Sequence, residues 1–180
     1  KLAIIKVASA CLIAGMLYLL CGITWIVVTN SLFGWEGTKT SIQLSFSVTT
    51  LLPYNVGQLQ WANLLGGFLL FLSSICFTLL LSSLAKSNVS ALALALLFVL
   101  LPFLVYTVMP GQLGDWLQAL LPGAGIGLGN SLLYAMTNFD FLHLGSASFW
   151  NTDVMLMLAL VKIPLFIMFT IVVYDRKRIR

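Results

Sequence analysis

The residues that could do chemistry are few, and they form no known catalytic set. The chain has a single histidine, His143, and its three cysteines all lie inside apolar runs. Phosphate loops (GxxxxGK followed by Ser or Thr), HExxH zinc motifs, GxSxG nucleophile elbows and CxxC pairs are all absent from the sequence. We therefore predict no catalytic residue, no bound cofactor and no metal site in this chain.

The closest approach to a reactive cluster is formed by Asp140, His143 and Asp153. Asp140 precedes His143 by three residues, a spacing that allows a metal or proton pair, but we expect both residues in an outer loop as a solvated pair. A membrane-embedded enzyme would have only these three residues to work with. The glycine run at 123–129 follows no predicted strand, so it does not indicate a nucleotide site.

Lys162 is the charged residue that most needs an explanation. It lies nine residues beyond Asp153, which is roughly 13 Å along a helix and close to the middle of a bilayer. A charge at that depth is costly unless it is paired or hydrated. In one interpretation Lys162 faces a wet cavity or an anionic group on a transport path. In the other, the helix begins later and the side chain snorkels outward.

A second polar set lies in the apolar segment 63–84. Its members are small hydroxylic residues: Ser73, Ser74, Thr78, Ser82 and Ser83. Small side chains let membrane helices approach closely, so one interpretation is a packing face. The alternative is that these residues line a polar transport path together with Lys162.

The composition shows what kind of scaffold must position these residues. Hydrophobic residues make up 61% of the chain and charged residues 8%, whereas soluble domains are about 25% charged. The mean hydropathy is +1.06. Four runs are close to the ~20 residues needed to span a bilayer: 4–28, 63–84, 90–109 and 154–174. We predict an all-α integral membrane protein, with residues 1–180 as a single transmembrane domain.

The basic residues predict the orientation of these spans. A basic cluster at 176–180 follows the last apolar run, and Lys and Arg are retained on the cytoplasmic side of a membrane. Four crossings then place both termini in the cytoplasm of a multi-pass protein of the cytoplasmic (inner or plasma) membrane. Most of the nine basic residues agree with this topology: Lys1, Lys6, Lys86, Arg176, Lys177, Arg178 and Arg180. Because they stand at span ends, they do not indicate a nucleic-acid partner.

The connections between the predicted spans differ in length and in expected structure. Residues 116–136 are apolar but contain Pro122 and several glycines, so we predict a short helix near 115–121, a turn and a second short helix, either interfacial or re-entrant on the outer side. Residues 42–49 alternate between apolar and polar, which predicts an extended segment. Residues 53–55 (PYN) predict a turn before the second span. Residues 85–88 form a minimal inner loop.

Several stretches together resemble one membrane-protein family. They are a first span behind Lys1 and Lys6, the sequences LPYNVGQL (52–59) and LSSLAKS (81–87), the Leu-Pro steps at 101–102 and 121–122, and a last span ending in YDRKR (174–178). In this pattern the chain resembles the membrane-spanning permease subunit of type-2 ABC exporters, specifically its C-terminal portion. The similarity covers essentially the whole chain.

The resemblance implies partners and a function. Permeases of this family have six transmembrane helices, pair as two units and dock an ATP-binding subunit, so the four spans would be the third to sixth helices of a longer protein. The implied function is ATP-driven export of an amphipathic or peptide-like substrate, with ATP bound only by the partner. The implied ATPase contacts are Lys86, Ser87 and Asn88, with Arg176, Lys177 and Arg178 either weaker contacts or a topology anchor. The alternative is a non-transporting membrane scaffold or sensor.

Overall fold

Four long apolar helices dominate the fold. The computed structural model describes residues 2–45, 53–127, 130–138 and 140–179. Each of the four is long and apolar enough to cross a membrane, which confirms the predicted number of spans. They are α1 (Leu2–Phe33), α3 (Val56–Leu84), α4 (Asn88–Val108) and α7 (Asn151–Ile179).

Each of the four helices extends beyond its predicted span at one end at least. α1 continues to Phe33, and α3 begins at Val56, seven residues before the predicted start. The cause at α3 is a capping box: the Asn55 side chain accepts from the Gln58 N–H at 2.7 Å, and the Gln58 side chain accepts from the Asn55 N–H at 3.0 Å. Such a box starts a helix regardless of hydropathy. The apolar runs therefore located the spans but not the helix ends.

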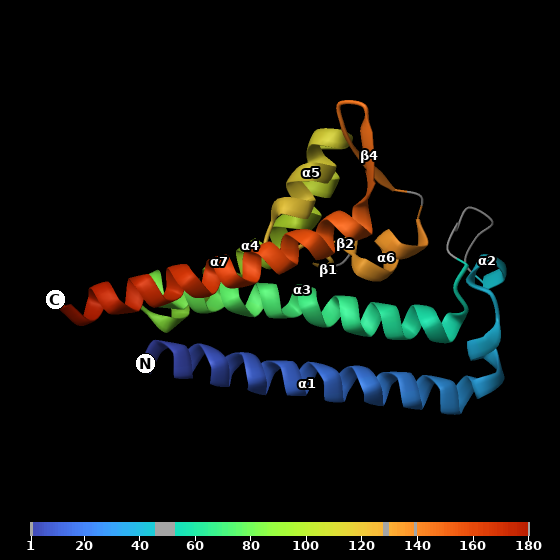
Figure 1. Ribbon diagram of the computed structural model, residues 1–180, viewed down its shortest axis with the longest axis horizontal. Helices are drawn as coiled ribbons and strands as arrows, with labels where there is room; N and C mark the ends of the chain where they lie inside the picture. The colour runs from blue at the N-terminus through green and yellow to red at the C-terminus, as the bar shows by residue number, and fades with distance from the viewer. Residues whose placement is uncertain (1, 46–52, 128–129, 139, 180) are drawn as a thin grey trace.

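The helices are arranged so that both termini lie at one end of the molecule (Figure 1). The Lys6 ammonium lies 5.7 Å from the centre of the Tyr174 ring, which joins the start of α1 to the end of α7. The turn between α3 and α4 lies at the same end. We call it the terminal end, and the opposite end, toward which α5, α6 and the β-hairpins lie, the hairpin end. α3 is the central helix and contacts α1, α4 and α7.

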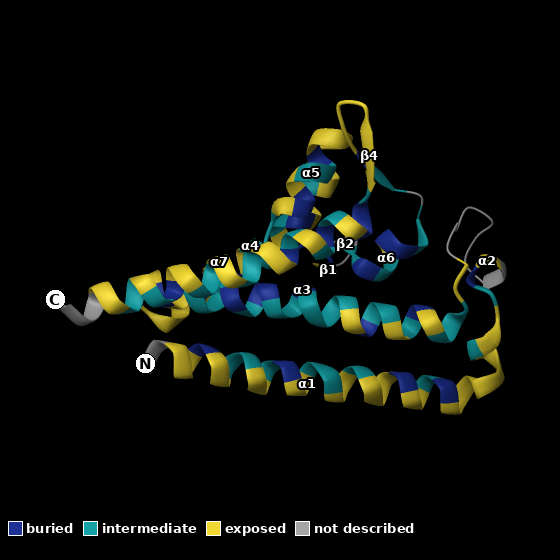
Figure 2. Ribbon diagram, viewed as in Figure 1, coloured by how far each residue is buried: buried dark blue, intermediate teal, exposed yellow. Residues whose placement is uncertain are grey.

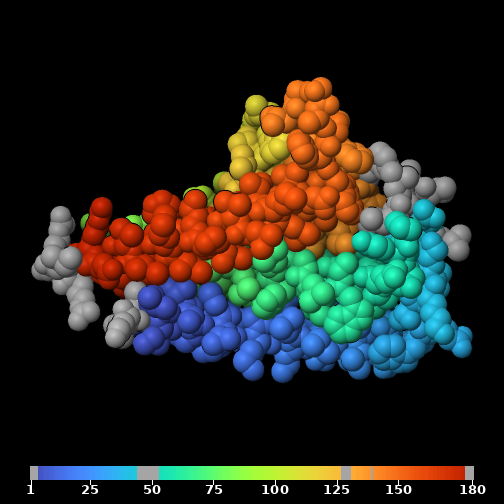
Figure 3. Space-filling view, viewed as in Figure 1, coloured from blue at the N-terminus to red at the C-terminus, as the bar shows by residue number. Residues whose placement is uncertain are grey.

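The segment between α4 and α7 forms a small module that stands out from the side of the bundle (Figures 1 and 3). It contains the two predicted short helices, α5 (Gln112–Leu120) and α6 (Leu132–Thr137). It also contains two antiparallel hairpins that the all-α prediction missed. Their strands are β1 (Ile126–Gly127) with β2 (Asn130–Ser131), and β3 (Phe141–Leu144) with β4 (Ala147–Trp150).

The connection between α1 and α3 corrects one prediction. It contains a 3-10 turn, Trp35–Lys39, and a short helix, α2 (Ile42–Ser45). The extended segment predicted for 42–49 is therefore wrong at 42–45, and its remaining residues lie outside the described part. Ile42 is fully buried and its N–H donates to the Tyr54 carbonyl at 3.1 Å. Four alternating residues are too few to distinguish a strand from one helical turn anchored by a buried side chain.

The main buried core lies toward the hairpin end. It joins α2, α3, α5, α6, β3 and the first turns of α7, and it includes the fully buried Ile42, Leu132, Leu142 and Met155. By contrast, the outward face of α1 is exposed along most of its length (Figure 2). Such an apolar face is suited to lipid or to another protein.

Candidate functional site

Lys162 makes the most informative polar contact in the structure. It lies in α7 eleven residues after Asn151, which is about 16 Å along the helix axis and near its middle. Its ammonium donates to the Ala119 carbonyl at 2.8 Å and to the Leu121 carbonyl at 3.0 Å. Neither sequence interpretation anticipated this contact. Lys162 binds the backbone at the end of α5, whereas the interpretations placed it at a wet cavity or an anionic group, or let it snorkel outward along α7.

The end of α5 explains why a cation is placed there. The last carbonyls of a helix have no partner within the helix, and the C-terminus carries a partial negative charge. Ala119 is the penultimate residue of α5, and Leu121 is its C-cap. The Lys162 ammonium therefore supplies a donor to the Ala119 carbonyl, a second donor to the Leu121 carbonyl, which also accepts from the Ala124 N–H, and a positive charge that complements the helix dipole. These hydrogen bonds are charge-assisted and are stronger than those between neutral groups.

The turn that follows α5 is inserted between α3 and α4. We call residues 121–125 the wedge. The Ser74 hydroxyl of α3 donates to the Pro122 carbonyl at 2.6 Å. On the other side, a Cβ added to Gly123 would lie 2.9 Å from Val99 Cα and 3.0 Å from the Phe98 carbonyl oxygen of α4. Only glycine allows this close approach between the two backbones.

Gly125 completes the wedge by turning the chain. Its φ of +77° is a left-handed conformation, and a Cβ there would overlap the Leu70 side chain. Ser74, Val99 and Lys162 all lie near the middle of their helices. The wedge is therefore non-helical backbone at mid-height of the bundle. Its carbonyls accept from backbone N–H groups and, in addition, from one ammonium and one hydroxyl.

The other hydroxylic residues of α3 are used differently. Thr78 donates to the Ser74 carbonyl at 2.9 Å and Ser83 to the Leu80 carbonyl at 2.7 Å, both within their own helix. Ser82 is exposed, whereas the buried Ser73 hydroxyl has no partner among the described residues. Of the predicted path residues, the structure thus brings Ser74 and Lys162 to one feature, the wedge.

The predicted ATPase contacts lie at the terminal end. Lys86 and Asn88 are exposed. Ser87 is the N-cap of α4: its hydroxyl accepts from the Ser90 N–H at 3.2 Å. Arg176 is exposed, while the side chains of 177 and 178 lie outside the described part.

Asp140, His143 and Asp153 do not converge. His143 Nδ1 lies 2.7 Å from the Ser148 hydroxyl, Asp140 accepts from the Asn151 side chain, and Asp153 is exposed. No group of three or more His, Cys, Asp or Glu residues that could hold a metal ion is found in the described residues.

The contacts between α5 and β3 were not anticipated from the sequence. The Gln112 side chain donates to the Phe141 carbonyl at 3.1 Å and accepts from the His143 N–H at 2.8 Å, and the Trp116 indole donates to the His143 carbonyl at 3.0 Å. Burial, followed by the nearby Asp140 carboxylate, raises the pKa of Asp115 in the first turn of α5. These contacts fix the start of α5 as Lys162 fixes its end.

Comparison with known protein families, with curated proteins and with solved structures finds no match for this chain. No related protein therefore indicates a function for this chain, and the geometry of its polar groups is the structural guide to one. Its central feature is a charged side chain near the middle of an apolar bundle, holding a non-helical turn in place.

Proposed function

We propose that this chain is part of the permease of an ATP-driven exporter, which moves an amphipathic or peptide-like substrate across the cytoplasmic membrane. The wedge and Lys162 are the observation that carries the proposal. Irregular backbone at membrane depth is tolerated where it is buried in protein or lines a wet cavity. Ionisable residues at that depth typically mark substrate or ion pathways. A passive anchor would need neither feature.

The proposal assigns the terminal end to the cytoplasm. The exposed Lys86, the turn between α3 and α4, and both chain ends lie together there (Figure 1), and basic residues favour the cytoplasmic side. A separate ATP-binding subunit would contact this end through Lys86, Ser87 and Asn88. The short outer helices α5 and α6 would then form a segment that enters the membrane from the opposite side.

The proposal also includes a second permease unit. α4 presents an apolar stripe away from the rest of the chain: Leu92, Leu96 and Leu100 are each more than half exposed. This spacing places the three side chains on one helix face. In the proposed assembly this face meets either the second unit or the bilayer lipid.

Co-purification with an ATPase is the direct test. The full-length protein that contains this chain is extracted with a mild detergent, and its partners are identified by mass spectrometry. We expect an ATP-binding subunit to be retained, and Lys86→Glu to weaken its retention by reversing a charge at the docking surface. Lys39→Glu is the matched control, because Lys39 is exposed at the opposite end.

Recovery of a homo-oligomer without any ATPase would contradict the proposal and favour the scaffold or sensor. Equal loss of the ATPase in Lys86→Glu and Lys39→Glu would instead contradict the assigned docking surface. Tagging the C-terminus tests the orientation separately, since a tag accessible from outside intact cells would place the terminal end on the wrong side.

A further inference from the structure

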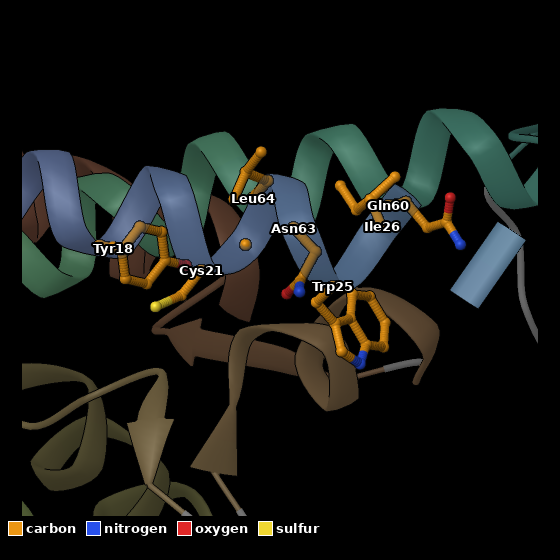
Figure 4. Close-up of a pocket in the computed structure, with 8 residues that line it drawn as sticks. Tyr18, Cys21, Trp25, Ile26, Gln60, Asn63 and Leu64 are labelled. Carbon is orange, nitrogen blue, oxygen red and sulfur yellow. The ribbon is translucent and has the colours of Figure 1, made fainter. Parts of the chain in front are cut away.

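A groove between α1 and α3 remains after the wedge has been described. One hollow of about 380 Å³ is lined by both helices, including Tyr18, Trp25 and Asn63 (Figure 4). A second hollow of about 370 Å³ shares these three residues and continues to α6 and the wedge residue Gly125. We call the two together the α1/α3 groove. Both hollows are open, so the groove is accessible from the surface of the bundle.

Asn63 is one of the polar groups in this groove, with the Tyr18 hydroxyl and the Trp25 indole N–H, for which no hydrogen bond is found among the described residues. One turn away on α3, Gln60 forms two hydrogen bonds with Asn30 of α1, at 3.0 and 3.2 Å. No hydrogen bond joins the Asn63 side chain to any residue that the structure describes. An amide in an apolar environment is costly without a partner. Figure 4 shows the Asn63 amide on the same side of the helix pair as the Tyr18 ring and the Trp25 indole.

The walls of the groove are aromatic and partly rigid. The Tyr18 ring stacks on Phe71 with a centroid distance of 5.0 Å, and its hydroxyl lies against Gly67, where a Cβ would overlap it. Trp25 is 56% exposed, so one face of its indole is free for contact. No charged residue lines either hollow in the part of the chain that the structure describes.

We propose that the α1/α3 groove binds one uncharged amphipathic molecule that enters from the bilayer, with its flat apolar part against Tyr18 and Trp25 and an amide group on Asn63. An amide is the matching group because the Asn63 side chain both donates and accepts. The uncharged lining disfavours a charged ligand, which would lose its hydration without gaining a counter-ion. The site stands without transport; only its role as a cargo site rests on the proposed function.

Photolabelling with an amide probe tests the site. The full-length protein is placed in phosphatidylcholine vesicles with 4-benzoyl-N-hexylbenzamide, irradiated and digested, and the adducts are mapped by mass spectrometry. We expect saturable labelling on α1 between Tyr18 and Trp25. Loss of one hydrogen bond inside a membrane predicts that Asn63→Leu lowers this labelling about fivefold. Gln43→Leu, which removes an exposed amide outside the groove, should leave it unchanged.

Two further reagents separate the amide contact from general effects. Asn63→Gln keeps an amide and should retain most of the labelling, which shows that a loss in Asn63→Leu is not misfolding. The ester hexyl 4-benzoylbenzoate lacks the N–H donor, so it should label wild type more weakly and respond less to Asn63→Leu. Equal labelling of Asn63→Leu and wild type by the amide probe would overturn the proposal.

The remaining outcomes distinguish other occupants. Unsaturable labelling over all lipid-facing helices would mean partition into lipid only, and would refute the site. A groove covered by a second copy would show no labelling, and Cys21, which is exposed at its edge, would cross-link between copies. Saturable labelling without a co-purified ATPase would support the groove and refute the exporter, while the reverse result would refute only the groove.

Discussion

The two halves of the bundle are held together by different means. From mid-height to the hairpin end, the core joins six elements, and buried or half-buried polar groups make long-range contacts: Lys162 with the end of α5, Ser74 with Pro122, and Asn30 with Gln60. Toward the terminal end, contacts between helices are mainly apolar or aromatic, as between Phe77, Phe98 and Phe166. Hydrogen bonds between elements fix the arrangement of the hairpin half, whereas the packing of apolar side chains fixes that of the terminal half.

This difference predicts that the terminal half can move more easily than the hairpin half. Polar pairs in an apolar medium have few alternative arrangements, because separating them leaves both partners unsatisfied. Apolar contacts are less directional and can slide. A hydrogen bond that joins helices in this half is a weak one, between the Cys11 and Cys76 thiols, whose sulfurs lie 3.8 Å apart between α1 and α3. The proposed function, with ATP driving an exporter from the cytoplasmic side, would require this division into a fixed outer half and a deformable inner half.

The strongest test of this contrast is Lys162→Met. The substitution leaves the Ala119 carbonyl without its donor and removes one of the two donors to the Leu121 carbonyl, which still accepts from the Ala124 N–H. An unsatisfied buried acceptor costs about 1–3 kcal/mol. We expect a loss of about 3 kcal/mol in the free energy of unfolding, measured by denaturation of the full-length protein in lipid nanodiscs.

Lys86→Met is the matched control at the terminal end, where the lysine is exposed. It should change the free energy of unfolding by less than about 0.5 kcal/mol. Equal stability of Lys162→Met and Lys86→Met would mean that the ammonium does not hold α5.

The sequence predicts the spans because the bilayer thickness demands long apolar runs, and it predicts a break at the wedge because Pro122 and the glycines disfavour a helix. It also marks Lys162 as anomalous. The partner of Lys162 was not predictable, since the carbonyls it contacts are 43 and 41 residues away and leave no periodic trace in the sequence. Every residue carries a backbone carbonyl, so the sequence does not show which carbonyl will accept a hydrogen bond.

The two β-hairpins and the groove were missed for related reasons. β3 and β4 have four residues each, and their register depends on the turn at Gly145, with a φ of +62°. Such short strands carry too little alternation to be recognised. Asn63 was assigned to the first position of a predicted span, where an amide is unremarkable. Only the packing of α1 against α3 shows that it faces a hollow.

A smaller effect is expected from Gly123→Ala. The added Cβ would meet the backbone of α4 at 2.9 Å, which cannot yield without moving the helix. Overpacking of this kind costs about 1–3 kcal/mol, and we expect about 2 kcal/mol by the same denaturation.

Gly15→Ala is the comparison at the interface of α1 with α3. There the Cβ would lie 3.0 Å from the Phe68 ring, a side chain that can rotate away. Alanine also favours helix over glycine by up to about 1 kcal/mol, so the net change should be near zero. If both variants lost the same stability, the wedge would be no tighter than the interface of α1 with α3.

Ser74→Ala should have a more modest effect. It removes the hydrogen bond to the Pro122 carbonyl, and membrane hydrogen bonds are worth about 0.6 kcal/mol on average and up to about 1.7 kcal/mol. We expect a loss of about 1 kcal/mol. Thr170→Val is the matched variant, because buried Thr170 donates only to the Phe166 carbonyl of its own helix. A larger loss in Thr170→Val than in Ser74→Ala would reverse the proposed contrast between the halves.

The smallest effect concerns Asp115 and pH. Burial and the Asp140 carboxylate raise the pKa of Asp115 above its ordinary value of 3.8, so the folded state retains its proton to higher pH than the unfolded state. Stability must then fall as pH rises from the ordinary value through the raised one, and stay constant above it. Asp115→Asn should remove this part of the decline, as followed by tryptophan fluorescence during unfolding between pH 3.5 and 6. An identical pH profile in the variant would place Asp115 in water and loosen the contact between α5 and β3, leaving Lys162 as the main constraint on α5.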